Sequence, residues 1–221
     1  MTLRLESDGA ERYPGFIEPE VMAQLEAHLT EATACAGIRI FNDPWLDDWL
    51  AQSSLTNLVV SLLDADARPV RAILFDKSEE ANWAVGWHQD RTIAVRRRID
   101  LPGFGRWTIK GGAQHVEPPS RVIERMVTAR IHLDPVMPDN APLLIASGSH
   151  RLGRIAETDI EEVIARCEKV ACLAERGDVW LYRTAIVHAS ERSSSDSGRR
   201  VLQVDFSADG LPGGLEWLGI S

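Results

Sequence analysis

The sequence predicts a mainly β fold, a jelly roll with supporting helices near its N-terminal end. From residue 69 onward, short stretches rich in β-branched and aromatic residues alternate with long connections that contain Pro and Gly. Before that point, apolar residues recur at helical spacing. We therefore expect one domain over residues 1–221, with mostly helical N-terminal support in 1–68 and the jelly-roll core in 69–208.

Three helical regions are predicted. In 19–36, apolar residues recur every three or four positions, which indicates an amphipathic helix. Asp43-Pro44 is a typical N-cap and first-turn pair, and it opens a helical region to about residue 63 with a break near Ser53-Ser54. A later helix is expected after the capping box at 158–161.

Strands dominate the rest of the chain. Each predicted strand combines β-branched or aromatic residues with turn-forming residues at its ends. The sequence does not give the pairing of the strands. The predicted strands are 69–75, 83–95, 126–134, 169–174, 178–188 and 199–207.

Composition excludes several classes of partner. The net charge of −9 argues against nucleic acid or an anionic membrane as the main partner. The three cysteines have no Cys-x-x-Cys spacing, which is typical of a reduced, cytoplasmic protein. No apolar run has the length of a membrane span or the character of a signal peptide.

Pairs of His and an acidic residue two positions apart are the first candidates for a metal site. With 6 His and 33 acidic residues, about one such pair is expected by chance. The spacing alone therefore does not choose among them. The chain has three, His88/Asp90, His115/Glu117 and His132/Asp134.

The pair His88/Asp90 has the most suggestive context. It lies in a predicted strand, where residues two apart point to the same face. A second His from a distant strand, His188, would complete two imidazoles and one carboxylate, a ligand set that suits non-haem Fe(II). His132/Asp134, on the strand 126–134, is the rival pair.

A cation follows at a suggestive distance. Arg199 lies 11 residues after His188 (199 − 188), enough for the chain to turn and return alongside. A cation near a metal suits a dicarboxylate that chelates the metal at one end. Arg199 and Arg200 face opposite ways on a strand, and the more polar face, with Arg199, either lines a solvated pocket or simply meets water; alternation alone does not choose.

These motifs occur in a familiar order. Around the Trp-His-x-Asp strand and Arg199 stand the segments 139–143, 148–150, 177–179 and 188–190. Together they resemble the phytanoyl-CoA dioxygenase family of Fe(II)- and 2-oxoglutarate-dependent oxygenases, over about residues 75–206. One departure is Ala141, where the family usually has Gly after Asn140.

The resemblance implies a double-stranded β-helix (jelly roll, cupin-like) and a set of roles. His88, Asp90 and His188 would hold Fe(II), and Arg199 would bind the distal carboxylate of 2-oxoglutarate with help from Ser190. The implied reaction uses O2 and 2-oxoglutarate to hydroxylate an unactivated C–H bond of a small molecule, with release of succinate and CO2. No side chain acting as a general acid or base is required.

The sequence gives weaker evidence for residues that contact the substrate than for the metal ligands. Arg130 and His132 share a face of their predicted strand, and Trp107 and Lys110 follow in a nearby segment; all four are candidates. For Arg130 and His132, a salt-bridged or solvated strand face is an equal alternative. The run Arg96-Arg97-Arg98 could receive a phosphate, although such runs are usually solvated.

Two other functions remain open at this stage. One is a cupin-like protein that binds a metal or small molecule without turnover, which would not need the oxoacid anchor Arg199. The other is a different oxidative outcome, namely desaturation, epimerisation or halogenation. Asp90 disfavours halogenation, because a carboxylate occupies the position that a halide would need. The sequence does not identify the substrate.

Overall fold

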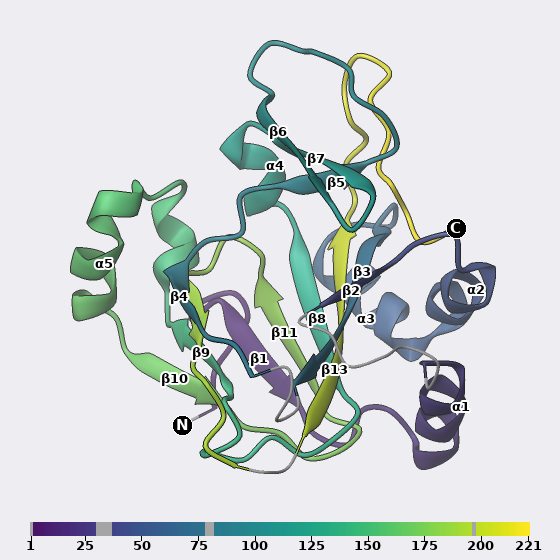
Figure 1. Cartoon of the computed structure of the whole chain (residues 1–221), viewed down its shortest axis with the longest axis vertical. Coiled ribbons are helices and arrows are strands. Elements are labelled where there is room, and N and C mark those ends of the chain that lie inside the picture. The colour runs from purple at the N-terminus through teal and green to yellow at the C-terminus, as the bar shows by residue number, and fades with distance from the viewer. Residues whose placement is uncertain (1, 30–36, 78–81, 196–197) are drawn as a thin grey trace.

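Two antiparallel sheets face each other in the computed structural model, which describes residues 2–29, 37–77, 82–195 and 198–221 (Figure 1). A third, small sheet lies at one end of the molecule (Figure 1). The large sheet contains β1 (Ala10–Tyr13), β11 (Val179–Arg183), β8 (Val127–His132), β13 (Arg199–Ser207), β3 (Arg68–Lys77) and β2 (Ile38–Ile40), in that order. The facing sheet has the order β10 (Lys169–Cys172), β9 (Leu143–Ala146), β12 (His188–Ser190), β4 (Val85–His88), and the small sheet β5 (Ile93–Val95), β7 (Ala113–Glu117), β6 (Gly105–Lys110).

Helices cover the outer face of the large sheet. The helices α1 (Pro19–Leu29), α2 (Pro44–Gln52) and α3 (Ser54–Leu62) pack there (Figure 1). Their buried leucines form one apolar core with alternate residues of the strands, including Leu202 and Phe206. The prediction of a jelly roll with N-terminal helical support is therefore confirmed.

The N-terminal helices begin and end as the sequence indicates. Asp43 caps α2 through a hydrogen bond of 3.0 Å from the backbone N–H of Leu46, with Pro44 in the first turn. Ser53 separates α2 from α3, and its Oγ accepts from the N–H of Thr56 at 3.1 Å. The predicted helix 19–36 is confirmed over Pro19–Leu29, and its remaining positions, 30–36, lie outside the described residues.

The late helix forms without the predicted capping box. Thr158 lies in a short 3₁₀ turn, Glu157–Asp159, and its hydroxyl donates to the Asp159 side chain at 2.7 Å. The helix α5 (Ile160–Arg166) begins after that turn, and Asp159 makes no side-chain capping bond to it. Thr158 therefore bonds to Asp159 and not to the backbone at the start of the helix.

Two predicted strands are each divided between sheets. The stretch 83–95 is β4 in one sheet and β5 in another, and 178–188 is β11 followed by β12. Between β11 and β12 the N–H of Ile186 bonds to the carbonyl of Arg183 at 2.9 Å, and the N–H of Val187 bonds to Ser149 Oγ. The apolar run that resembles a strand is thus a buried turn that crosses from one sheet to the other.

Several short elements gave no clear signal in the sequence. They are β1, β2, β6, β7, β9 and the helix α4 (Ser120–Glu124). Most have three to six residues, too few for periodicity to be read. None of the helices in the described part of the chain combines the length and hydrophobicity needed to cross a membrane.

Candidate metal centre

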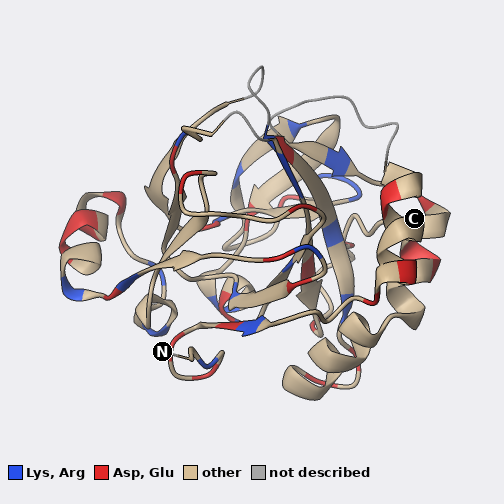
Figure 2. Ribbon diagram, turned by 90° about the horizontal axis from the view of Figure 1, so that it is seen from below, with Lys and Arg blue, Asp and Glu red and all other residues tan. Residues whose placement is uncertain are grey.

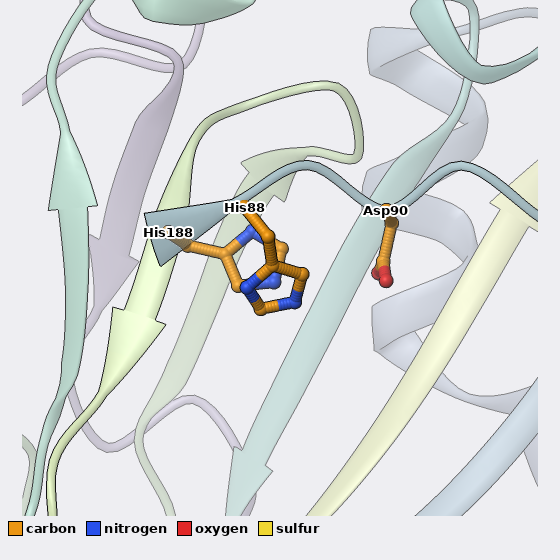
Figure 3. A group of neighbouring side chains, drawn as sticks. All are labelled: His88, Asp90 and His188. Atoms are coloured by element: carbon orange, nitrogen blue, oxygen red, sulfur yellow. The ribbon is translucent and has the colours of Figure 1, made fainter. Parts of the chain in front are cut away.

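Strand pairing brings the two candidate histidines together. The strands β4 and β12 are antiparallel neighbours, and their register places His88 directly opposite His188. Side chains opposite each other on paired strands point to the same face. The two imidazole rings accordingly lie side by side with their centroids 4.4 Å apart (Figure 3).

Asp90 reaches the same place from a loop. The strand β4 ends at His88, so the expected alternation of His88 and Asp90 along one strand is wrong. Gln89 explains the end of the strand, because its side chain bonds to the backbone of Gly153, Ala185 and Ile155 at 2.7–2.9 Å. These bonds lead the chain out of the sheet, and Asp90 follows on the loop with its carboxylate on the same side of the chain as the His88 imidazole (Figure 3).

The three side chains form one potential metal site. One ligand atom from each of His88, Asp90 and His188 lies within 4.8 Å of the other two. Among the residues that the structure describes, no other group of three or more His, Cys, Asp or Glu side chains meets this condition. Two imidazoles and a carboxylate on one side of an ion leave its other positions open, as non-haem Fe(II) requires.

Backbone carbonyls orient both imidazoles. His88 Nδ1 lies 2.8 Å from the carbonyl oxygen of Gly86, and His188 Nδ1 lies 3.0 Å from that of Ile186. Because a carbonyl oxygen can only accept, each Nδ1 carries the proton and donates it. In the neutral imidazole the Nε2 lone pair is then available to a metal. Burial lowers the pKa of His188 to about 4, so this ring is neutral at pH 7.

Arg71 holds Asp90 in its ionised form. Burial alone would raise the pKa of Asp90, but Arg71 and the neighbouring imidazoles outweigh burial, and the pKa lies below its ordinary value. Arg71 Nη2 is 3.5 Å from Asp90, and Arg71 Nε is 2.5 Å from Asp205. Sequence reasoning missed Arg71, although its alternation with Ile73 and Phe75 on one strand could have placed it on the cavity side.

The two rival His-x-acid pairs do not form a site. Asp134 bonds to Arg200, and both ring nitrogens of His132 are buried with no hydrogen-bond partner among the described residues. Glu117 lies 2.9 Å from Arg154 and 3.3 Å from Arg106. His115 is fully buried in the small sheet, and its Nδ1 faces the carbonyl of Ala113 at 3.1 Å.

A cavity of about 200 Å³ opens in front of the three candidate ligands. Arg199 and Ser190 line it, as expected. Arg199 Nη2 donates to the carbonyl of Ala141 at 2.7 Å and lies 3.5 Å from Ser190 Oγ. Ala141 adopts a positive φ of 48°, so the turn keeps its left-handed conformation without the usual Gly.

Lys77 is a second cation beside Arg199. It ends β3 directly opposite Arg199 of β13, and its Nζ lies 3.4 Å from Ser190 Oγ. Burial and then the charges of Arg199 and Arg130 lower the pKa of Lys77 to about 8. Sequence reasoning missed this residue because its strand was expected to end at 75.

The adjacent Arg200 faces the other way. It binds Asp134 at 2.8 Å and lies 3.5 Å from Glu26 of α1, on the helix-covered side. The predicted difference in facing between Arg199 and Arg200 is confirmed.

The four proposed substrate residues divide into two pairs. Arg130 and Lys110 line the cavity. Trp107 and His132 are not among its lining residues, so the structure does not place them at the cavity. Trp107 packs in an apolar cluster on the other face of its strand, with Arg98 stacked on it. His132 is 2% exposed and Arg130 is 6% exposed, so His132 is the more buried of the two.

The arginine run lies apart from the cavity. Arg98 pairs with Asp100 at 3.0 Å and stacks on Trp107, and Arg96 pairs with Glu216 at 3.9 Å. None of the three lines the cavity. The run therefore has the solvated character that is usual for such sequences.

Comparison with known proteins gives a consistent family and fold. The sequence profile described as phytanoyl-CoA dioxygenase (PhyH) matches residues 5–201. A search of curated proteins gave no match.

Among solved structures, AviO1 from Streptomyces viridochromogenes Tue57 has a TM-score of 0.67 at 21% identity, covering 95% of this chain and 94% of that one. The α-ketoglutarate-dependent epimerase SnoN from nogalamycin biosynthesis has a TM-score of 0.63 at 15% identity, covering 96% and 88%. HygX from Streptomyces hygroscopicus, with nickel and 2-oxoglutarate bound, has a TM-score of 0.61 at 14% identity, covering 92% and 84%.

Proposed function

The chain belongs to the phytanoyl-CoA dioxygenase family of Fe(II)- and 2-oxoglutarate-dependent oxygenases, and from that premise we propose that it hydroxylates an unactivated C–H bond of a small molecule. The observation that carries the proposal is the coincidence, in one cavity, of three potential Fe(II) ligands and Arg199. A metal site alone would not need a buried guanidinium in the same cavity. A dicarboxylate co-substrate does need one.

Each residue at the cavity has a proposed task. Nε2 of His88 and His188, with the carboxylate of Asp90, would hold Fe(II), which supplies the oxidative chemistry when bound. Arg199 would bind the distal carboxylate of 2-oxoglutarate, with Ser190 and Lys77 as further donors. Arg71 keeps Asp90 ionised, and the backbone carbonyls of residues 86 and 186 keep both imidazoles in the ligating tautomer.

The oxidative outcome is the finer part of the proposal. An epimerase, SnoN, and a monooxygenase, ThoJ, both share this fold. Asp90 supports an outcome other than halogenation, since a halide would have to take the place of its carboxylate. We expect products with one added oxygen atom and no chlorine when turnover runs in chloride buffer, as measured by mass spectrometry. Chlorinated, desaturated or epimerised product would replace hydroxylation with that reaction.

The alternative is a protein that binds metal and small molecules without turnover. The test is release of succinate and CO2 from 2-oxoglutarate by purified protein under air, with and without Fe(II). We expect iron-dependent formation of the two products in equal amounts. Tight binding of both iron and 2-oxoglutarate with no succinate formed would favour the non-catalytic alternative.

The proposal also includes the domain organisation, the class of partner and the cellular location. We expect residues 1–221 to act as one domain on a small-molecule substrate, with no nucleic acid involved, because the net charge is −9. The thiols of Cys167 and Cys172 are unpaired, which supports a reducing, cytoplasmic location. HygX has been crystallised with hygromycin B, and SnoN with a nogalamycin compound, so substrates of natural-product size are compatible with this fold.

A further inference from the structure

Cations outnumber anions at the cavity. Five cationic side chains line it, and the only acidic side chain among the described lining residues is Asp90. Figure 2 shows basic residues on strands in the middle of the molecule as well as on its outer loops and helices. The five are Arg39, Arg71, Lys110, Arg130 and Arg199.

The cations form two groups. The Arg199 group consists of Arg199, Arg130 and Lys77. Lys77 lies directly opposite Arg199, and burial together with the charge of Arg130 lowers the pKa of both. The Lys110 group consists of Lys110, Arg39 and Arg71. Burial and then the charges of Arg71 and Arg39 lower the pKa of Lys110.

Charges from both groups act on the candidate metal ligands. His188 is under the influence of Arg130, from the Arg199 group. Asp90 is under the influence of Arg71 and Lys110, from the other. Register separates the two groups along β3, because Arg199 lies opposite Lys77, whereas Arg71, six residues earlier (77 − 71), pairs with Asp90. A molecule of 2-oxoglutarate that reaches from the metal to Arg199 would therefore lie toward Lys77 and away from Arg71.

Local structure brings Lys110 and Arg39 to one place. Arg39 lies on β2 opposite Ile73 of β3, and both residues line the cavity. The turn between β6 and β7 covers the stem of Arg39 so closely that a Cβ on Gly111 would lie 3.1 Å from Arg39 Cδ. Lys110 immediately precedes that turn and points its Nζ toward Thr92 Oγ1, 3.4 Å away.

In the described part of the chain, Lys110 forms no direct ion pair, and Asp90 acts on its charge only from a distance. The hydroxyl of Thr92 is neutral. Arg71, by contrast, is paired with both Asp205 and Asp90. When bound, Fe(II) and the 2-oxoglutarate dianion would cancel each other's charge. Because Asp90 and Asp205 both pair with Arg71, neither of these carboxylates forms an ion pair with Lys110.

We propose that the substrate carries an anionic group, a carboxylate or a phosphate, that binds to Lys110 and Arg39. This inference rests on the proposed function, because it places 2-oxoglutarate on the Arg199 group. The body of the substrate would contact Ile73, the apolar lining residue directly opposite Arg39. Fixing one end of the molecule at Lys110 determines which carbon faces the metal, so the Lys110 group would set the position of oxidation.

Calorimetry on the loaded protein tests the proposal without turnover. The protein is saturated with Ni(II) and 2-oxoglutarate, and four probes with the same chain are titrated in turn, namely hexanoate, hexyl phosphate, hexanol and hexylamine. We expect at least one anion to bind at one site per chain, at least tenfold more tightly than hexanol or hexylamine. Which of hexanoate and hexyl phosphate binds more tightly identifies the anionic group.

Variants locate the binding site. Lys110→Met is expected to weaken binding of the preferred anion at least tenfold and to leave 2-oxoglutarate binding unchanged. Lys110→Arg should retain the binding of that anion. The matched control is Lys169→Met, at an exposed lysine of β10, which should change neither affinity.

Several results would overturn the inference. These are equal binding of hexanol and the anions, anion binding that survives in Lys110→Met, and competition of the anion with 2-oxoglutarate. Failure of 2-oxoglutarate itself to bind would overturn the proposed function as well. Normal binding of 2-oxoglutarate with no preference for an anion would overturn only the role of the Lys110 group.

Discussion

The two faces of β13 show how one strand serves both stability and chemistry. Leu202, Val204 and Phe206 are buried in the apolar core beneath α1, α2 and α3. Arg199 and Gln203, on the other face, line the cavity. The two sets differ only by alternation along the strand, so a shift of one residue in register would exchange them.

The two faces of β13 differ in what a buried side chain requires. On the helix face, removal of apolar surface from water stabilises the fold and no partner atoms are needed. On the cavity face each polar group requires a partner, and Gln203 accepts from Arg130 at 3.0 Å and Tyr182 at 3.3 Å. We expect substitutions on the helix face to lower stability and substitutions on the cavity face to lower activity.

The largest effect is expected at the candidate metal ligands. His88→Ala or Asp90→Ala should abolish iron-dependent turnover of 2-oxoglutarate, measured as succinate, while the unfolding midpoint changes little. His132→Ala should keep iron binding, because His132 is buried away from the cavity. Iron content that is normal in His88→Ala and lost in His132→Ala would reverse the assignment.

On the helix face, Phe206→Ala should lower the free energy of unfolding by about 3–5 kcal/mol, because Phe206 is fully buried and a cavity would remain. Urea denaturation of the purified protein measures it. The matched variant on the cavity face is Gln203→Met, which keeps most of the volume and should cost less, about 1–3 kcal/mol, because Arg130 and Tyr182 lose an acceptor. Equal losses of unfolding free energy in the two variants would contradict the assignment of stability mainly to the helix face of β13.

A third comparison uses neighbouring arginines on opposite faces. Loss of a charge-assisted hydrogen bond, worth roughly 1.5–3 kcal/mol, should weaken 2-oxoglutarate binding about tenfold to a hundredfold or more. Arg199→Ala should therefore raise the apparent KM for 2-oxoglutarate at least tenfold in steady-state assays. Arg200→Ala removes a half-exposed ion pair with Asp134 and should barely change KM. Similar values in the two variants would contradict the facing of β13.

The smallest predicted effect concerns pH. The pKa of Lys77 is lowered to about 8 by burial and by Arg199, Arg130 and Arg192, so its ammonium loses a proton near that pH in the free protein. An anionic co-substrate favours the protonated form, so binding takes up a proton. The Kd for 2-oxoglutarate should rise with pH above about 8, by at most about tenfold per pH unit. Lys77→Met should flatten this dependence, and an unchanged slope in that variant would exclude Lys77 as its source.

Local patterns predicted much of this architecture. Alternation along β13 gave the correct facing of Arg199 and Arg200, and the cap at Asp43 gave the start of α2. Both depend on neighbours within a few residues. Short strands with long connections predicted the jelly roll, and the family resemblance assigned His88, Asp90 and His188 to one site before any strand pairing was known.

Long-range contacts account for what the sequence did not predict. The end of β4 depends on bonds from Gln89 to residues about 64–96 positions away, which no local pattern records. Likewise Trp107 and Lys110 share one short strand, but only the pairing of that strand with β7 determines that Lys110 faces the cavity. Arg71 was overlooked because its partner Asp205 is 134 residues away.

A structure determined without oxygen, with Fe(II) and 2-oxoglutarate bound, tests the central claim most directly. We predict that the iron is held by Nε2 of His88, Nε2 of His188 and the carboxylate of Asp90. The distal carboxylate of 2-oxoglutarate should lie on the guanidinium of Arg199, with the Lys110 side of the cavity left open. Iron bound at another group, or the distal carboxylate bound at Lys110 and Arg39, would contradict the account.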